Sequence, residues 1–341
     1  MIPHPAPACQ TGDWRKALSQ AIRDPAELLD RLALPRELLP AAQRAAALFP
    51  LRVPRGYVAR METGNPADPL LRQVLPLDEE LLTTDNYSHD PVGDQAAMPI
   101  PGLLHKYRGR VLLITTAACG VHCRYCFRRH FPYSEAKAAT NDWHAALDYI
   151  AKDNSINEVI LSGGDPLSLS DDRLASLVMQ LEAIPHIKRL RLHTRQVIIL
   201  PERVDSALLS WLADCQLPMV IVVHTNHANE IDTEVAIALQ RLASINNIIL
   251  LNQAVLLRGV NDEVAALMAL SERLFENRVL PYYLHQLDRV QGAQHFEVSD
   301  GQAVNLMNQL RNRLPGFLVP RLVRERTGAA SKIPIESYTE L

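Results

Sequence analysis

The sequence predicts an α/β protein built on a parallel sheet that is either open or curled into a partial or complete barrel. From residue 108 onward, short apolar segments alternate with amphipathic helical segments. Most of the apolar segments are nearly continuous rather than alternating, as expected of strands covered on both faces. With 341 residues, 48% of them hydrophobic, the chain can bury a sizeable core as one large domain or two smaller ones.

The first region, residues 1–107, differs from the rest. Helical patterns lie at residues 13–22 and 24–34, and Pro-rich irregular segments follow them. We therefore expect an N-terminal helical layer followed by a segment that wraps around the protein.

The second region, residues 108–290, carries the alternating elements. Its six predicted strands are residues 110–119, 157–165, 188–195, 218–226, 247–255 and 279–287. A helix follows Ser170, because the next apolar residues recur at i, i+3, i+4 and i+7, and another begins at Asp262. The third region, residues 291–341, carries one amphipathic helix and then the segment RERTGAASKIPI.

Polar clusters follow all six predicted strands. In order these are the cysteines after 110–119, then SGGD, HTR, HTNH, NQ and HQLD. Turn chemistry explains any one such cluster, but it does not explain six in a row. Because ligands bind at the carboxyl ends of parallel strands, we expect one composite site there.

The segment CGVHCRYCFRRH, residues 119–130, holds three of the five cysteines. An odd number of cysteines cannot all pair, so a disulfide framework is disfavoured. Structural zinc sites usually close with two paired clusters, and this chain has one, so zinc requires a further ligand such as His122 or His130. Three thiolates on a four-iron cluster instead leave one iron open for a substrate or cosubstrate.

The cysteine segment resembles the signature of the radical S-adenosylmethionine (SAM) superfamily, C-x3-C-x-aromatic-C. The matching residues are Cys119, Cys123, Tyr125 and Cys126. The resemblance implies a partial (β/α)6 radical SAM barrel and a [4Fe-4S] cluster held by the three cysteines. It also implies SAM bound to the free iron, with Tyr125 beside it, and cleavage of SAM to a 5′-deoxyadenosyl radical.

Other segments resemble the SAM-binding parts of the superfamily. The glycine-rich segment LSGGDPL implies that Gly163, Gly164 and Asp165 receive the methionyl amino group. In the aminomutase branch a histidine and a glutamine on later strands hold the carboxylate side of SAM, and His224 and Gln253 match them.

From about residue 50 to 335 the chain is similar to the lysine 2,3-aminomutase family. The similar segments include GNPADPLLRQVLP, PGLLHKY, LLNQAVLLRGVND, PYYLHQLDRVQGAQHF and SKIPI. The resemblance implies that Lys332 forms a Schiff base with pyridoxal 5′-phosphate (PLP) and that Arg110 lies near PLP. It implies conversion of L-lysine to β-lysine. Lys106 precedes the first barrel strand, and we assign it to the wrong end of the barrel.

The resemblance also implies a substrate site. Arg128 matches the arginine that binds the carboxylate of lysine, a contact suited to the guanidinium fork. Asp288 matches an acid that receives the ε-ammonium group. Seven residues before Lys332, the lysine-degrading members have a second aspartate, and this chain has Glu325. The acidic group is thus retained on a longer side chain, which is compatible with a dibasic substrate. Alternatively, Glu325 in the segment RERT fits an ordinary surface ion pair.

The chain ends nine residues after Lys332 and lacks the zinc-binding cysteines that lysine-degrading aminomutases carry beyond this motif. With the segments HKYRGR, FRRHFPYSEA, IPHIKRLRLH and QLDRVQGAQHF, it looks like the shorter bacterial branch, the elongation factor P (R)-β-lysylation proteins (EpmB). That branch implies (R)-β-lysine as product, a β-lysine ligase and elongation factor P as functional partners, and an unidentified reductant. A homo-oligomer is compatible with it.

Two alternative interpretations remain. One is a catabolic or osmolyte-forming lysine 2,3-aminomutase that yields (S)-β-lysine. The other is a zinc-stabilised module that binds nucleic acid or protein without turnover, which the net charge of −3 and 5% aromatic residues disfavour. With no long apolar segment and no signal-like N-terminus, we expect a cytoplasmic protein with no membrane or nucleic-acid partner.

Overall fold

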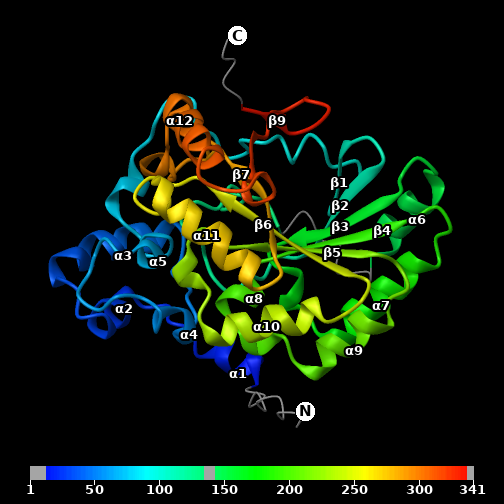
Figure 1. Cartoon of the computed structure of the whole chain (residues 1–341), viewed down its shortest axis with the longest axis horizontal. Helices are drawn as coiled ribbons and strands as arrows, with labels where there is room; N and C mark the ends of the chain where they lie inside the picture. Colours follow the sequence, from blue (N-terminus) through cyan, green and yellow to red (C-terminus); the bar gives the residue numbers. More distant parts are fainter. Residues whose placement is uncertain (1–12, 134–142, 336–341) are drawn as a thin grey trace.

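The computed structural model describes residues 13–133 and 143–335. Within these residues nine strands form one sheet, in the order β1 to β9 (Figure 1). The strands are β1 Leu103–Tyr107, β2 Arg110–Thr116, β3 Glu158–Gly163, β4 Arg189–Thr194, β5 Met219–His224, β6 Ile248–Val255, β7 Leu280–His285, β8 Arg321–Arg324 and β9 Ile333–Pro334.

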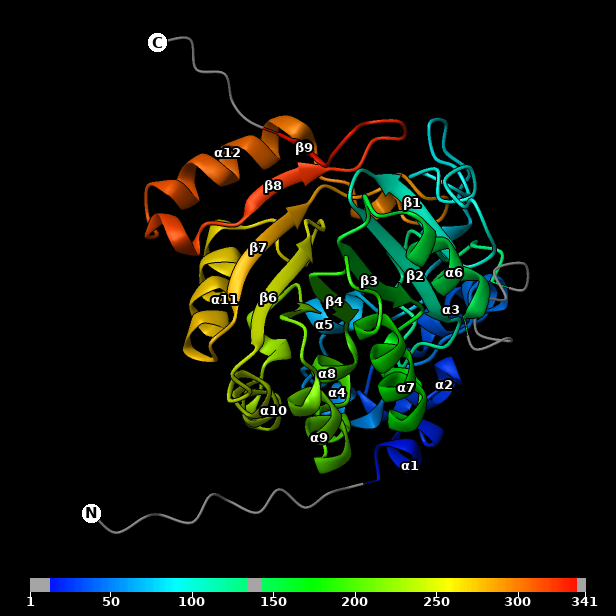
Figure 2. The same ribbon diagram turned by 90° about the vertical axis from the view of Figure 1, so that its right-hand side faces the viewer.

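The sheet is a curled, open barrel. Strands β2 to β8 pair in parallel with one another in chain order, whereas β1 pairs antiparallel with β2 and β9 pairs antiparallel with β8 at the two ends of the sheet. Figure 2 shows how the strands curve around a common interior. The six predicted strands and the partial radical SAM barrel are confirmed. The seventh parallel strand, β8, was not predicted, because its four residues directly follow Pro320.

Helices cover the outer face of the sheet (Figure 1). They are α6 His144–Lys152, α7 Asp171–Glu182, α8 Gln196–Ile199, α9 Ser206–Asp214, α10 Thr233–Ala243, α11 Val264–Glu276 and α12 Asp300–Arg311. The helix predicted after Ser170 is confirmed as α7, whose four periodic apolar residues are buried. The helix predicted from Asp262 begins at Val264.

The two faces of the sheet differ in polarity. On β4, Leu190 and Leu192 are buried in the main hydrophobic core under the helices. Because side chains alternate along a strand, Arg191 and His193 lie on the other face, inside the barrel. The interior is therefore polar, which makes it suitable for a charged ligand.

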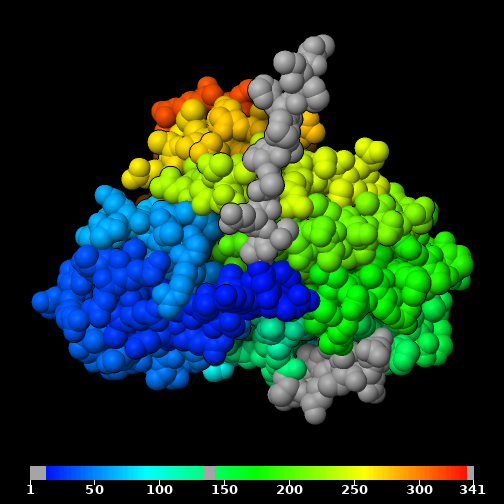
Figure 3. All heavy atoms as spheres, turned by 90° about the horizontal axis from the view of Figure 1, so that it is seen from below, coloured from blue at the N-terminus to red at the C-terminus, as the bar shows by residue number. Residues whose placement is uncertain are grey.

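A helical layer precedes the barrel. It contains α1 Trp14–Ser19, α2 Pro25–Arg31, α3 Leu39–Leu48, α4 Arg55–Val58 and α5 Pro69–Arg72. Its own hydrophobic core includes Val121, from the cysteine segment, and Ile199 and Leu200, at the end of α8. Figure 3 shows the layer (blue) directly beside the barrel helices (green). Among the described residues no helix has the length and apolar character needed to cross a membrane.

Candidate active site

The cysteine segment lies directly after β2. Cys119, Cys123 and Cys126 are half-buried and form no disulfide. Burial raises the pKa of the Cys119 thiol well above its usual value, and the neighbouring Cys126 and Cys123 raise it further. Burial, and then Cys123, likewise raises the pKa of Cys126 to about 11. The three thiols therefore share one buried neighbourhood, where bound iron would favour the thiolate form.

This arrangement fits a [4Fe-4S] cluster. Among the described residues no group of three His, Cys, Asp or Glu side chains is placed to hold a single metal ion. A cluster does not require such a group, because each thiolate binds a different iron. Two cysteines have no predicted role: Cys215 is free and buried, and Cys9 lies outside the described residues.

The two glycines after β3 allow close contact with the backbone that leads into Cys119. A Cβ atom on Gly163 would lie 2.7 Å from the Thr116 carbonyl oxygen, and one on Gly164 would lie 2.3 Å from the Ala118 carbonyl oxygen. The Gly164 N–H donates to Thr116 at 2.7 Å. Close backbone approach was predicted here for SAM, whereas the observed contacts position the cysteine segment. The contact with SAM remains a prediction.

Asp165 joins the ends of two strands. Its buried carboxylate accepts hydrogen bonds from the Thr194 hydroxyl at 2.8 Å and from the backbone N–H groups of Arg195 at 2.7 Å, Gln196 at 2.9 Å and Leu167 at 3.0 Å. Burial raises the pKa of this carboxyl group despite these donors. Any contact between Asp165 and SAM therefore competes with four internal donors.

Tyr125 links the cysteine segment to the end of β5. Its hydroxyl lies 2.9 Å from His224 Nε2, and the two rings stack with centroids 5.7 Å apart. Burial lowers the pKa of His224 to about 3, so the imidazole is neutral at physiological pH. Gln253 of β6 pairs in register with His224. Three of the residues predicted to contact SAM thus lie together.

A chain of ion pairs connects the cysteine segment to the C-terminal lysine. Arg128 Nε lies 2.7 Å from Asp94 Oδ2, and Lys106 Nζ lies 2.6 Å from Asp94 Oδ1. Lys106 also lies 3.0 Å from Glu325 Oε1, and Lys332 Nζ lies 2.5 Å from Glu325 Oε2. The structure therefore unites Arg128, Glu325 and Lys332, three residues that the sequence assigned to substrate and PLP.

Two members of this chain were missed from the sequence. Assigning Lys106 to the wrong end was an error, because its side chain reaches Glu325 from β1. The antiparallel pairing of β1 with β2 places it there, and no pattern in the sequence indicated that pairing. Asp94 lies in the irregular segment DPVGD, where no periodicity marked it. Lys106 does stand within PGLLHKY, a segment that could have drawn attention to it.

Arg110 and Asp288 lie near the same chain of ion pairs. The Arg110 guanidinium stacks on the ring of Tyr107 at 4.7 Å. Burial raises the pKa of Tyr107, and the adjacent Glu325 raises it further. Tyr107 therefore lies between Arg110 and Glu325, the ion-pair partner of Lys332.

The two acids of the predicted lysine site differ in protonation. Burial raises the pKa of Asp288 to about 7, an effect that Lys332 opposes and Glu325 reinforces. Burial would also raise the pKa of Glu325, but Lys332 and Lys106 outweigh it and lower the pKa to about 2. Without substrate, Glu325 is anionic and Asp288 is about half protonated near neutral pH.

Two interior histidines were contained in predicted polar clusters but not singled out. His193 and His285 lie on the inner face of β4 and β7. Burial lowers the pKa of both well below the usual value, and Lys332 adds to the effect. Both imidazoles are therefore neutral groups facing the interior that also holds Lys332.

Replacing Asp288 with asparagine is expected to flatten the pH dependence of stability. A carboxyl group with a folded pKa of about 7 and an unfolded pKa of about 3.9 binds more protons when folded, so the wild type loses stability as pH rises between these values. Between pH 5.5 and 8 we expect a loss of about 1–2 kcal/mol that Asp288→Asn avoids, after allowing for partial exposure. Urea unfolding at both pH values, with equal iron content, measures it.

A matched control for this prediction is Asp214→Asn, at the exposed end of α9. It should keep the wild-type change in unfolding free energy between the two pH values. If Asp288→Asn and the wild type change in parallel, the Asp288 carboxyl group does not have a raised pKa.

Comparisons with known proteins agree with this geometry. The family model of the 4Fe-4S single cluster domain matches residues 108–194, from the start of the barrel to the end of β4. The L-lysine 2,3-aminomutase of Escherichia coli (strain K12) is 48% identical over 95% of this chain and 94% of its own length. That of Haemophilus influenzae is 47% identical over 94% of both chains.

More distant proteins are also similar. The L-lysine 2,3-aminomutase of Clostridium subterminale is 33% identical over 95% of this chain and 77% of its own length. A radical SAM methyltransferase from Sphaerobacter thermophilus aligns at a TM-score of 0.45 and 17% identity over 67% of this chain and 71% of its own, a likeness too distant to bear on the assignment. The full-length similarity shows that the chain belongs to the lysine 2,3-aminomutase family of radical SAM isomerases.

Proposed function

We propose that the protein is a radical SAM, PLP-dependent L-lysine 2,3-aminomutase that converts (S)-α-lysine to (R)-β-lysine for the β-lysylation of elongation factor P. The observation that carries this proposal is the chain of ion pairs from Arg128 to Lys332. Its cations are complementary to a carboxylate and a phosphate, and its anions are complementary to an ammonium. These groups extend from the cysteine segment to the candidate PLP lysine.

The charge of the site suits an anionic cofactor and a zwitterionic substrate. Three cations, Arg128, Lys106 and Lys332, share two anions, Asp94 and Glu325. The excess positive charge favours binding of the PLP phosphate and of the substrate carboxylate. Lys332 would hold PLP covalently, with Arg110 nearby, and PLP supplies the carbonyl that holds the migrating amino group.

Arg128 is prepared for carboxylate binding. Asp94 occupies its Nε, and Nη1 lies 3.5 Å from the Ser162 hydroxyl, a weak contact. The guanidinium is thus oriented by Asp94 and retains N–H groups for a substrate carboxylate.

The acids can receive the distant ammonium of lysine. Glu325 accepts from the ammonium groups of Lys106 and Lys332, and the distant ammonium of lysine would be a cation of the same kind for this carboxylate. Asp288, about half protonated near neutral pH without substrate, would gain a favourable partner for its anionic form when an ammonium enters. This pair of acids supports a dibasic substrate.

The radical half of the site is proposed on the cysteine side. Cys119, Cys123 and Cys126 would hold the cluster, and His224, Gln253, Tyr125, Gly163, Gly164 and Asp165 are the candidate SAM contacts. SAM supplies the radical that removes hydrogen from the β-carbon, which no acid or base could ionise in water.

The pathway is proposed from sequence similarity. Identity to the proteins of Escherichia coli and Haemophilus influenzae is 48% and 47%, against 33% for that of Clostridium subterminale. Together with the motifs that resemble the elongation factor P branch, this favours (R)-β-lysine over the (S) product. A β-lysine ligase, elongation factor P and a reductant would be its functional partners in the cytoplasm.

Anaerobic incubation of the purified protein with L-lysine, SAM and a reductant is expected to yield (R)-β-lysine. Chiral chromatography of the products measures the outcome, and omission of SAM is the control. The (S) product would replace the elongation factor P assignment with the catabolic or osmolyte alternative. A colourless, zinc-loaded protein that yields no β-lysine would overturn the enzyme proposal and leave the binding module.

A further inference from the structure

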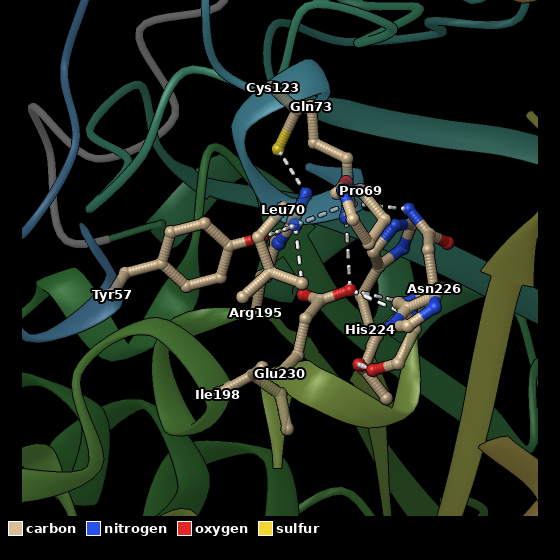
Figure 4. Close-up of polar contacts among 12 residues, drawn as sticks. Tyr57, Pro69, Leu70, Gln73, Cys123, Arg195, Ile198, His224, Asn226 and Glu230 are labelled. Carbon is tan, nitrogen blue, oxygen red and sulfur yellow. Dashed lines mark hydrogen bonds and ion pairs between the residues drawn. The ribbon is translucent and has the colours of Figure 1, made fainter. Parts of the chain in front are cut away.

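A buried polar network contacts the cysteine segment at Cys123 (Figure 4). Its centre is Arg195, which follows β4 and is buried. The groups around it are Tyr57, Gln73, Cys123, Tyr125, Asn226 and Glu230. The network joins the helical layer, the cysteine segment and the ends of β4 and β5, and the proposed chemistry assigns no part of it to lysine or PLP.

Arg195 divides its donors between two kinds of partner. Nη1 donates to Cys123 Sγ at 2.8 Å and also contacts the Tyr125 hydroxyl. Nη2 donates to Gln73 Oε1 at 2.8 Å and to Glu230 Oε2 at 3.0 Å. One terminal nitrogen of the guanidinium therefore donates to a cysteine of the candidate cluster, and the other donates to a carboxylate.

Glu230 is itself fixed. Its side chain is fully buried, and Oε1 accepts hydrogen bonds from the backbone N–H groups of Asn226 at 2.8 Å and His227 at 3.0 Å. Gln73 Nε2 donates to the same oxygen at 3.2 Å. The carboxylate therefore holds Arg195 against the sulfur in one orientation.

A cation held against a cluster ligand affects the electron affinity of the cluster. Reduction adds one negative charge to the cluster and its thiolates, and hydrogen bonds to sulfur and nearby positive charge stabilise that charge. The effect is strong where water is excluded. A buried carboxylate on the far side of the cation opposes it.

We propose that Arg195 is a positioning residue whose hydrogen bond to Cys123 raises the reduction potential of the [4Fe-4S] cluster, and that Glu230 limits this effect while fixing the guanidinium. The inference rests on the proposed function, because it requires the cluster. The step concerned is the transfer of one electron from a low-potential donor to the oxidised cluster.

The test is a redox titration of the anaerobically reconstituted full-length protein with dithionite, followed by electron paramagnetic resonance. Arg195→Met, which removes the donor and the charge, should lower the equilibrium constant for one-electron reduction about tenfold, a shift of about 59 mV to lower potential. Glu230→Gln, which keeps the shape and removes the opposing charge, should shift the potential upward.

Two further variants separate this role from folding. The double variant Arg195→Met/Glu230→Gln leaves no unpaired buried charge, and it should titrate about tenfold below Glu230→Gln alone. Arg203→Met removes another fully buried arginine, whose Nη2 lies 2.8 Å from Asp171 Oδ1. Because this arginine does not contact the cysteine segment, its loss should leave the potential unchanged. Thermal unfolding and iron content are measured for every variant.

The outcomes are distinguishable. If the wild type binds no iron after reconstitution, the proposed function fails. If it binds a cluster but Arg195→Met and Glu230→Gln leave the potential unchanged, or shift it in the same direction, the network is structural and this inference fails alone. A fall in melting temperature without a shift in potential would likewise overturn the role proposed for Arg195.

Discussion

Replacing Lys332 with alanine should abolish aminomutase turnover, by at least about 10³-fold, and remove the imine absorbance of bound PLP. The alanine side chain has no amine, and the other lysine of the ion-pair chain, Lys106, approaches Glu325 from the opposite oxygen. The iron content should stay at the wild-type value, expected to be about four per chain, because the side chain of Lys332 pairs with Glu325 and not with Cys119, Cys123 or Cys126. Absorbance spectra, iron analysis and a β-lysine assay measure the three effects.

Lys188→Ala is the control, because this lysine is exposed at the start of β4. It should retain the absorbance and the turnover. If Lys332→Ala keeps the imine absorbance, another amine holds PLP, and the C-terminal segment does not have the role proposed for it.

The sequence was sufficient to predict the strands of the barrel. Most of the six predicted strands are near-continuous apolar runs, and all six end in a polar cluster. The strand at 188–195 instead alternates, because only one of its faces packs in the hydrophobic core. β8 escaped prediction because a four-residue strand beside a proline has too few residues to show a period. Its existence depends on pairing with β7, a tertiary contact.

The site was predictable only where its residues stand in one segment. The cysteines and the Gly-Gly-Asp turn are local patterns with a direct chemical interpretation. Lys106 and Glu325 are 219 residues apart, and Arg128 and Asp94 are 34 apart, so no spacing along the chain indicates that either pair meets. The resemblance supplied Arg128, Glu325 and Lys332, whereas Asp94 and Lys106 required the structure.

Some residues had a clear signal, although the sequence did not identify all their contacts. Gly163 and Gly164 were predicted to allow close approach to SAM; the backbone at Thr116 and Ala118 approaches them in the structure, and the contact with SAM stays a prediction. Arg195 stood in the cluster HTR at a predicted strand end, yet its partners Gln73 and Glu230 lie 122 and 35 residues away. Pattern alone marks such positions as special and does not identify what they contact.

Replacing Cys126 with alanine should prevent assembly of the cluster and eliminate turnover, again by at least about 10³-fold. Only three thiolates are available in this segment, so two remain for four irons, and only one of these two, Cys123, receives a hydrogen bond from Arg195. PLP binding should persist, because Lys332 and its ion-pair partners are unchanged. Iron analysis and the visible spectrum after anaerobic reconstitution measure the loss.

Cys215→Ala is the matched control, since its thiol is also buried but lies in the main hydrophobic core under the helices. Its loss removes apolar contacts and should lower the melting temperature while iron content and turnover per folded protein stay at the wild-type level. A Cys126→Ala protein that still binds about four irons and cleaves SAM would contradict the three-cysteine cluster, because the iron assigned to Cys126 would then be held by some other ligand. Retention of a single zinc ion by both the wild type and Cys126→Ala would instead mean that these thiols do not hold an iron cluster.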